Sequence, residues 1–498
     1  MPRLILGIQP AREAIRVHGE AISKVLVQDS AGPTLDALAR FAEGRGIPVE
    51  ARSRGDLDRL ATEPFGNFPT VTFRFDGPID FASISLAGMA VIALRFPSLD
   101  DAGRHARIGW WAAGVLRAAG AHRSHVGMVE LFYDLVFVFA ITQLSHGLLE
   151  RLTPLGALQV GVLFVGAWWL WMYTTWCTNW LNPASTAVRQ LLFALMLLGL
   201  LMSAALPHAF AERGLVFALA YVAQHLLRSL YMIRAFGPRT GHGRNFIRIS
   251  LWLLASGVFW IVGGLADPQT RLAWWTLAIA IEFLGPIAYF RLPGLGASST
   301  ADWDVDPQHM GERCGLFVII ALGESLLITG ATFADLPWNQ PSVLGFLAAF
   351  LGTVAMWWIY FDSGSERAVQ HFEHAADRGR VARLAYTYLH IPIIAGIVVC
   401  AVADELVLVH PEHAENAGIA AILGGPFLYL LGNALFKWVT NQRRLPPFSH
   451  MVGLAVLAAL SVPAFGHAFS ALALGWLTTA TLMLVALWEW FSLQRGKA

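Results

Sequence analysis

Charged side chains are scarce in this chain. Of its 498 residues, 14% are Asp, Glu, Lys or Arg and 56% are hydrophobic, with a mean hydropathy of +0.54. Soluble domains carry about 25% charged residues, so this composition excludes a protein that is soluble along its whole length. The 35 Lys and Arg nearly balance the 34 Asp and Glu, which argues against a chain-wide surface for nucleic acids or other polyanions.

Cysteines and metal-binding motifs are also few. The three cysteines, Cys177, Cys314 and Cys400, lie far apart, and no Cys-x-x-Cys pair occurs. This pattern excludes a disulfide scaffold and a cysteine-ligated zinc site. No apolar segment carries the His-x-x-x-His or His-Glu-x-x-His spacing of a helical metal site. We therefore expect no bound metal and no cofactor.

Long apolar runs are absent from the first 126 residues. The apolar stretch 4–8 is too short for a secretory signal, so none is expected there. Residues 1–98 alternate short apolar runs with amphipathic segments, which predicts a small α/β domain. The run 86–94 is too short to span a bilayer and predicts a buried strand. Residues 99–126 would form a linker, or the remnant of another domain.

The first 126 residues, which we call the head, contain two stretches typical of one enzyme family. Residues 7–15 read GIQPAREAI and residues 38–49 read LARFAEGRGIPV. Over about residues 4–75 this pattern resembles the substrate-binding domain of the SpoU-type RNA 2′-O-ribose methyltransferases. Residues 113–122, AGVLRAAGAH, resemble the first catalytic motif of that family, with Arg117 at the Arg position and Trp111 where an Asn is expected.

That resemblance stops where the methyltransferase would bind its cofactor. Membrane segments follow residue 122 in place of the knotted half that binds S-adenosylmethionine. A fold without its cofactor site cannot transfer a methyl group, so we expect no enzyme activity. The head is then a folded appendage, or, as the alternative, a domain that still binds RNA.

The rest of the chain is rich in long apolar segments. Hydrocarbon offers backbone groups no outside partner, so segments that cross it must be helices. We expect an all-α polytopic membrane protein with about twelve transmembrane helices, preceded by the small α/β domain. The membrane domain would cover 127–491 and a cytoplasmic tail 492–498. The segments are 127–149, 156–180, 188–210, 213–235, 246–266, 271–292, 310–332, 341–361, 381–403, 416–438, 449–465 and 470–491.

Basic residues are sorted between the loops. Loops that follow odd-numbered segments offer only Arg151, Arg213 and Arg271. By the positive-inside rule, both termini are cytoplasmic and the number of spans is even. We expect a multi-pass protein of the bacterial inner membrane. The loops that follow even-numbered segments, together with the tail, carry more basic residues: Arg189, Arg239, Arg244, Arg291, Arg367, Arg378, Arg380, Arg443, Arg444, Arg495 and Lys497.

Two pairs of segments suggest an internal repeat. Segment 1 opens with ELFYDLVFVF from Glu130, and segment 7 opens with ERCGLFVII from Glu312. Segment 2 ends with WWLWMY at 168–173, and segment 8 ends with WWIYF at 357–361. Six segments separate the members of each pair, which predicts a parallel 6+6 repeat. Repeats of this kind are common in transporters, where function gathers between the halves.

Ionisable residues within apolar segments stand out. Each costs about 2.5–3.5 kcal/mol on insertion scales, so it usually faces the bundle interior or a wet cavity. Glu130 and Asp134 lie on one helical face and need a cation nearby, for which Arg313 and Arg383 are the expected partners. The other candidates for an intramembrane polar pathway are Gln143, His146, Glu282, Glu312, Glu324 and His390.

These polar residues have two interpretations. In the first, they form ion pairs and hydrogen bonds that hold the helices together. In the second, they form a pathway for protons, cations or a small solute, with the carboxylates and His390 exchanging protons. A membrane-embedded enzyme would need a reactive cluster. Asp302, Asp304 and Asp306 form the acidic cluster here and are typical of a solvated loop.

Three stretches of the membrane domain resemble one bacterial family. They are ELFYDLVFVFAITQLSH at 130–146, HMGERCGLFVIIALGES at 309–325 and YLHIPIIAGI at 388–397. They are similar to the signatures of the low temperature requirement A (LtrA) proteins. The resemblance implies a membrane protein linked to growth in the cold, with no established activity. We expect it to translocate a proton, cation or small solute; the alternative is a structural, stress-adaptation protein of the membrane.

Overall fold

In a computed structural model, the chain divides into two compact units, Met1–Pro97 and Ser98–Ala498. The described residues are 25–28, 39–52, 114–117, 126–299, 305–362, 369, 372, 377–440 and 445–495.

Two strands and a helical turn are described in the first unit. Strand β1 (Val25–Gln28) pairs in parallel with β2 (Val49–Arg52), with Val25 opposite Val49. Residues 39–43 are helical and lie between the strands in sequence, and Ala42 and Ile47 are buried. The other elements expected in the head, including the strand at 86–94, lie outside the described residues.

The second unit is built of long helices. Their bounds follow the apolar runs closely, because each run ends where polar residues or Pro begin. The first six are α6 (Met128–Glu150), α7 (Pro154–Trp180), α8 (Thr186–Ala205), α9 (Gly214–Phe236), α10 (Gly241–Leu265) and α11 (Pro268–Ile287). The later ones are α12 (Pro307–Asp335), α13 (Gln340–Phe361), α16 (His390–Val409), α17 (Asn416–Thr440), α18 (Phe448–Phe465) and α19 (Ala471–Arg495).

Short elements join several of these helices. A 3-10 turn, η3 (Leu206–His208), extends α8, and α15 (Arg378–Val381) with the π-helix η5 (Ala382–Tyr388) precedes α16. Proline at the first turn and a side-chain cap start four helices, with Thr153, Asp267, Asp306 and Asn339 as the caps of α7, α11, α12 and α13.

Eleven helices of the described chain are long and apolar enough to cross a membrane. Twelve were expected from the sequence. The remaining helix, α11, forms at the place of the sixth expected segment and has 20 residues, so it is long enough. It falls short on apolar content because it contains Arg271 and Glu282 among tryptophans and threonines. The second unit therefore has the architecture of an all-α polytopic membrane protein.

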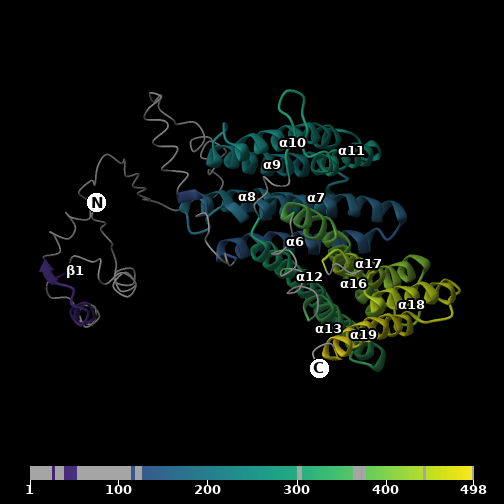
Figure 1. Ribbon diagram of the computed structural model, residues 1–498. Helices are drawn as coiled ribbons and strands as arrows, with labels where there is room; N and C mark the ends of the chain where they lie inside the picture. The colour runs from purple at the N-terminus through teal and green to yellow at the C-terminus, as the bar shows by residue number, and fades with distance from the viewer. Residues whose placement is uncertain are drawn as a thin grey trace, which may run out of the picture. The chain divides into compact units, whose positions relative to one another are not determined.

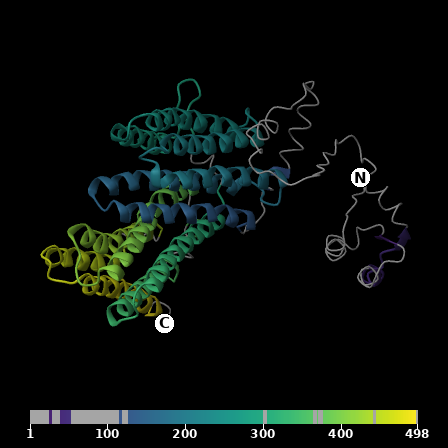
Figure 2. The ribbon, with the colours of Figure 1, turned by 180° about the vertical axis from the view of Figure 1, so that it is seen from behind.

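The helices lie in three groups, namely α6–α8, α9–α11, and α12 and α13 with α16–α19. Figures 1 and 2 show α9, α10 and α11 side by side on one side of α7, with α12, α13 and α16–α19 on the other side. Helices α6 and α7 both contact α12 and α16, so these four helices join the early part of the membrane unit to the later part.

The same sequence of packed pairs occurs twice along the chain. Helix α6 contacts α7 and α8, α8 contacts α9, α9 contacts α10, and α10 and α7 both contact α11. Six helices later, α12 contacts α13 and α16, α16 contacts α17, α17 contacts α18, and α18 and α13 both contact α19.

Candidate functional site

The most buried charged cluster of the described residues lies where α6, α7 and α12 meet. The first two turns of α6 supply Glu130 and Asp134, and the first two turns of α12 supply His309 and Arg313. All four side chains are fully buried, with 0% exposed. Charges at this depth persist only when they are paired, so the contacts of each group define what the cluster does. We call these four residues the α6–α12 cluster.

Glu130 holds the start of both helices. Its Oε2 accepts a hydrogen bond from the Gly127 backbone N–H at 2.8 Å, which caps α6. Its Oε1 lies 2.9 Å from His309 Nε2. On the other side of the ring, Asn179 Nδ2 lies 3.3 Å from His309 Nδ1. Asn179 also accepts from the Asp306 N–H at 2.7 Å, so α7 fixes the first turn of α12.

These contacts determine where the His309 ring carries its proton. Because Asn179 Oδ1 accepts from the Asp306 N–H, its Nδ2 donor faces the ring. His309 Nδ1 must then accept, and Nε2 carries the hydrogen that is donated to Glu130. His309 is therefore neutral in this arrangement, and Glu130 needs another source of positive charge.

Arg117 provides that charge. Its Nη2 lies 3.6 Å from Glu130 Oε2, and its Nε donates to the carbonyl oxygens of Thr178 and Leu181 at the end of α7. Residues 116 and 181 form a β-bridge that positions this segment. The sequence marked Arg117 as a remnant of a methyltransferase motif; in this structure its contacts belong to the membrane unit.

Asp134 and Arg313 form the second level of the cluster. Arg313 Nη1 donates to Asp134 Oδ2 at 2.6 Å and to the Glu130 carbonyl oxygen at 3.0 Å. Trp171 Nε1 donates to Asp134 Oδ1 at 2.8 Å, and the Trp171 ring lies under the guanidinium, 5.3 Å from its centroid. Arg313 is thus a partner of the α6 carboxylates, as the sequence led us to expect.

The charges of this site balance. Two carboxylates, Glu130 and Asp134, face two guanidinium groups, Arg117 and Arg313, with His309 neutral between them. A neutral set of paired charges can stay buried. The addition of one proton to either carboxylate would leave a guanidinium without its counter-ion and weaken the tie between α6 and α12.

The prediction that Arg383 is a second partner of these carboxylates was wrong. Arg383 lies in η5, where its Nη1 donates to the Pro286 carbonyl oxygen at 2.7 Å and its guanidinium lies 5.0 Å from the Tyr289 ring. The π-helical turn changes the residue spacing per turn, so it aims Arg383 toward the end of α11 and away from α6.

The other expected pathway residues are scattered. Glu312 accepts from the Val126 N–H at 3.3 Å, and Glu324 is buried farther along α12. On α6, His146 is exposed and Gln143 half-buried. His390 Nε2 lies 2.8 Å from Tyr360 Oη, which ties α16 to α13. These residues do not join the α6–α12 cluster.

Glu282 forms a separate polar centre among α9, α10 and α11. Its carboxylate accepts from Tyr221 Oη at 2.6 Å, from Ser256 Oγ at 2.5 Å and from Trp260 Nε1 at 2.9 Å. Three donors on two neighbouring helices converge on one buried acid, so Glu282 fixes the packing of this helix group.

Replacement of Glu282 by leucine is expected to lower the free energy of unfolding by about 2–3 kcal/mol. The change leaves three buried donors without an acceptor. Glu282→Gln is the matched control and should cost less than about 1 kcal/mol, because its amide oxygen accepts from two donors and its N–H₂ faces the Tyr221 hydroxyl. Denaturant titration in mixed micelles measures both, and equal losses would contradict the role given to Glu282.

Sequence reasoning missed a third polar centre, in the later helices. Lys437 Nζ on α17 donates to Glu489 Oε2 on α19 at 2.6 Å, and His450 Nδ1 on α18 lies 3.8 Å from Glu489 Oε1. Lys437 also donates to the Ile359 carbonyl oxygen. The signal was in the sequence, since both charged residues stand within apolar helices.

Asp404 was missed for a different reason. The expected ninth segment ended at residue 403, but α16 continues to Val409, so Asp404 lies within the helix. It lines a cavity between α13, α16, α17 and α19. Thr478 and Thr479 of α19 line it as well, and none of its lining residues is basic.

No group of three or more His, Cys, Asp or Glu side chains that could hold a metal ion occurs in the part of the chain that the structure describes. The cysteines Cys177, Cys314 and Cys400 are all free and buried.

Comparison with known proteins agrees with this architecture. The family described as bacterial low temperature requirement A protein (LtrA) matches residues 125–487. The chain is also 41% identical over 387 residues to an uncharacterized protein of Rhizobium meliloti (strain 1021), which covers 76% of this chain and 92% of that relative. No solved structure matches. The chain belongs to the bacterial LtrA family of membrane proteins.

Proposed function

We propose that this protein moves a proton or another small cation across the bilayer. The α6–α12 cluster, which we call the clasp because it ties α6 to α12, would control that movement. The observation that carries the proposal is the burial of Glu130 and Asp134, whose charges are balanced by Arg117 and Arg313, with His309 bound to Glu130. Ionisable groups at membrane depth are costly and usually serve transport or proton exchange.

The clasp would respond to protonation. Arg313 is held by the Asp134 carboxylate at 2.6 Å, so a proton on Asp134 removes the charge that keeps Arg313 buried. An unpaired buried charge is strongly unfavourable. The contact of α6 with α12 would weaken, and the helices on either side could then move relative to one another.

The cation itself would stop at Asp404. This carboxylate lines a cavity that Thr478 and Thr479 also line and that has no basic lining residue. Small residues, among them Gly345, Ala348 and Gly475, form much of its wall. A carboxylate without a cationic partner in its cavity is suited to bind a proton or a small cation.

Purified protein in liposomes tests the proposal. With an imposed pH gradient and an internal pH dye, the wild type should dissipate the gradient faster than protein-free vesicles. Asp404→Asn should reduce that rate by at least about tenfold, since it removes the charge that exchanges the cation. Asp335→Asn, at the end of α12, is the control and should keep the wild-type rate. No flux by the wild type under proton, sodium or potassium gradients would refute the proposal.

We also propose that the helices form a parallel 6+6 repeat. The packed pairs of α6–α11 recur in α12, α13 and α16–α19. In addition, the last helix of each half carries a buried carboxylate, Glu282 or Glu489, whose partners lie on the fourth and fifth helices of that half. With α11 counted as a span, the sorting of basic residues between the loops supports a protein of the inner membrane with both termini in the cytoplasm.

A structural role is the second candidate. It is favoured by the fact that Glu130, Asp134, Glu282 and Arg313 each have a close hydrogen-bond partner, as expected of residues that hold helices together. The two candidates differ in one respect. A structural protein carries no flux, and its Asp404→Asn variant would change stability alone.

The role of the head stays a separate proposal. The parallel pairing of β1 and β2 across a helical turn is compatible with an α/β domain that binds RNA and has no enzyme activity. The full-length protein in nanodiscs should then bind an RNA hairpin, with an affinity that falls steeply with salt. A chain that begins at Ser98, the first residue of the second unit, should not bind it, and equal binding by both chains would contradict the proposal.

A further inference from the structure

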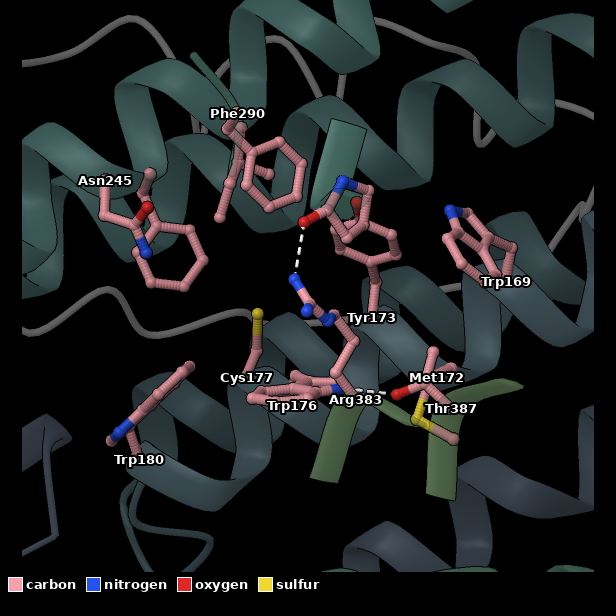
Figure 3. A pocket seen from close by; sticks show the side chains of 13 residues that line it. Trp169, Met172, Tyr173, Trp176, Cys177, Trp180, Asn245, Phe290, Arg383 and Thr387 are labelled. Carbon is pink, nitrogen blue, oxygen red and sulfur yellow. Dashed lines mark hydrogen bonds between the residues drawn. The ribbon is translucent and has the colours of Figure 1, made fainter. Parts of the chain in front are cut away.

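One cavity of the described residues lies away from the α6–α12 cluster. It is bounded by α7, α10, the end of α11 and η5 (Figure 3). Figure 3 shows side chains from these four elements pointing toward a common space, with the Arg383 guanidinium near its centre. Asp and Glu are absent from the lining side chains. We call it the aromatic pocket.

The walls of the aromatic pocket are flat rings held in place by other side chains. Trp169, Tyr173, Trp176 and Trp180 project from one face of α7, and Phe290 closes the opposite side. Trp169 stacks on Phe283, with centroids 4.5 Å apart and planes 11° apart. Trp176 Nε1 donates to Thr387 Oγ1 at 3.0 Å. Rings that are held this way form a rigid slot for another planar ring.

Two polar atoms of this wall lack a protein partner. Neither Trp169 Nε1 nor Tyr173 Oη has a hydrogen-bond partner among the described residues, although both atoms are buried. Trp169 is 1% exposed, and its nitrogen faces the interior of the pocket in Figure 3. A buried N–H without an acceptor is uncommon and unfavourable. A ligand that brings acceptor oxygens would satisfy both donors.

The backbone around the pocket is unusual in three places. Pro286 stands inside α11, Tyr289 and Phe290 have φ of 53° and 47°, and η5 is a π-helix that presents Arg383 and Thr387. Left-handed conformations of aromatic residues are strained, and π-helical turns are rare; both are frequent at ligand sites. Here they place Phe290, Arg383 and Thr387 at one cavity.

We propose that the aromatic pocket binds a neutral planar ring with carbonyl oxygens, a quinone-type molecule that enters from the bilayer. The stacked rings would hold its faces, and Trp169 Nε1–H and Tyr173 Oη–H would donate to its carbonyl oxygens. A neutral ring suits a site within membrane helices because it brings no charge to be desolvated. This inference does not depend on the proposed cation movement.

Binding of 1,4-naphthoquinone to the full-length protein in nanodiscs tests the inference. Equilibrium dialysis, corrected with empty nanodiscs, should show saturable binding of one molecule per chain. Naphthalene has the same ring without acceptors and should bind at least about tenfold more weakly. Tyr173→Phe keeps the ring and removes its donor, whereas Trp169→Phe removes the indole N–H and leaves a smaller aromatic ring. Each should weaken naphthoquinone binding by about five- to tenfold, and Tyr173→Phe should leave naphthalene binding unchanged.

A control variant and a charged probe complete the experiment. Trp338→Phe changes a 77% exposed tryptophan that does not line the pocket, and it should bind naphthoquinone like the wild type. Equal affinity for naphthalene and naphthoquinone, absence of saturable binding, or wild-type affinity in both donor variants would overturn the inference. Tighter binding of 2-naphthoate that is lost in Arg383→Gln would also overturn it, in favour of an anion site.

Discussion

Replacement of Arg313 by methionine is expected to lower the free energy of unfolding by about 3–5 kcal/mol. Arg313 is fully buried and donates to Asp134 at 2.6 Å and to the Glu130 carbonyl oxygen. Its removal leaves the Asp134 carboxylate in a low-dielectric interior without a counter-ion, and that situation costs several kcal/mol.

The double variant Asp134→Leu/Arg313→Met separates lost pairing from lost packing. It removes both charges and should recover most of the stability that Arg313→Met loses, since buried ion pairs are often replaceable by apolar residues of similar size. Denaturant titration in mixed micelles, followed by tryptophan fluorescence, measures all three proteins. A double variant as unstable as the single one would show that the two residues are not coupled.

Replacement of Gly396 by valine is expected to cost about 3 kcal/mol or more. A Cβ atom at this position of α16 would lie 2.5 Å from the Tyr429 backbone nitrogen and 2.7 Å from its Cα atom on α17. Backbone atoms cannot rotate away, so the two helices would have to separate, and overpacking of this kind is destabilising. Close approach through glycine is a common way for membrane helices to pack.

Gly424→Val on α17 is the matched control. A Cβ atom at Gly424 would meet nothing within 4 Å, so we expect a change of less than about 1 kcal/mol from helix propensity alone. Unfolding in mixed micelles and the yield of folded protein report both variants. Similar stability of the two variants would mean that α16 and α17 do not pack as closely as the structure shows.

Much of the membrane fold could be predicted from the sequence. The lengths of the apolar runs predict helices whose ends agree with those of α6, α9 and α13 within a residue or two, because hydrocarbon dictates both length and secondary structure. The number of membrane spans could not be predicted as well. The sixth helix, α11, forms but is too polar to count as a span by composition. Its Arg271 is nevertheless buried, because carbonyl oxygens of neighbouring segments accept its hydrogen bonds.

The candidate site could be predicted in part. The spacing of Glu130 and Asp134 on one helical face, and their need for a cation, indicated Arg313. The partners His309 and Asn179 could not be found this way, because their contacts depend on how the end of α7 meets the start of α12. Arg383 was misplaced because no sequence pattern signalled the π-helix that redirects it.

Proton flux through reconstituted Glu130→Gln and Asp134→Asn variants is the most direct test of the clasp. Both substitutions keep the size of the side chain and remove the charge that a proton would neutralise. Liposomes that contain equal amounts of folded protein are given a pH gradient, and the internal pH is followed with a dye. The account predicts wild-type flux that depends on pH and a changed pH dependence in both variants. Absence of wild-type flux, or variants that behave like the wild type, would contradict it.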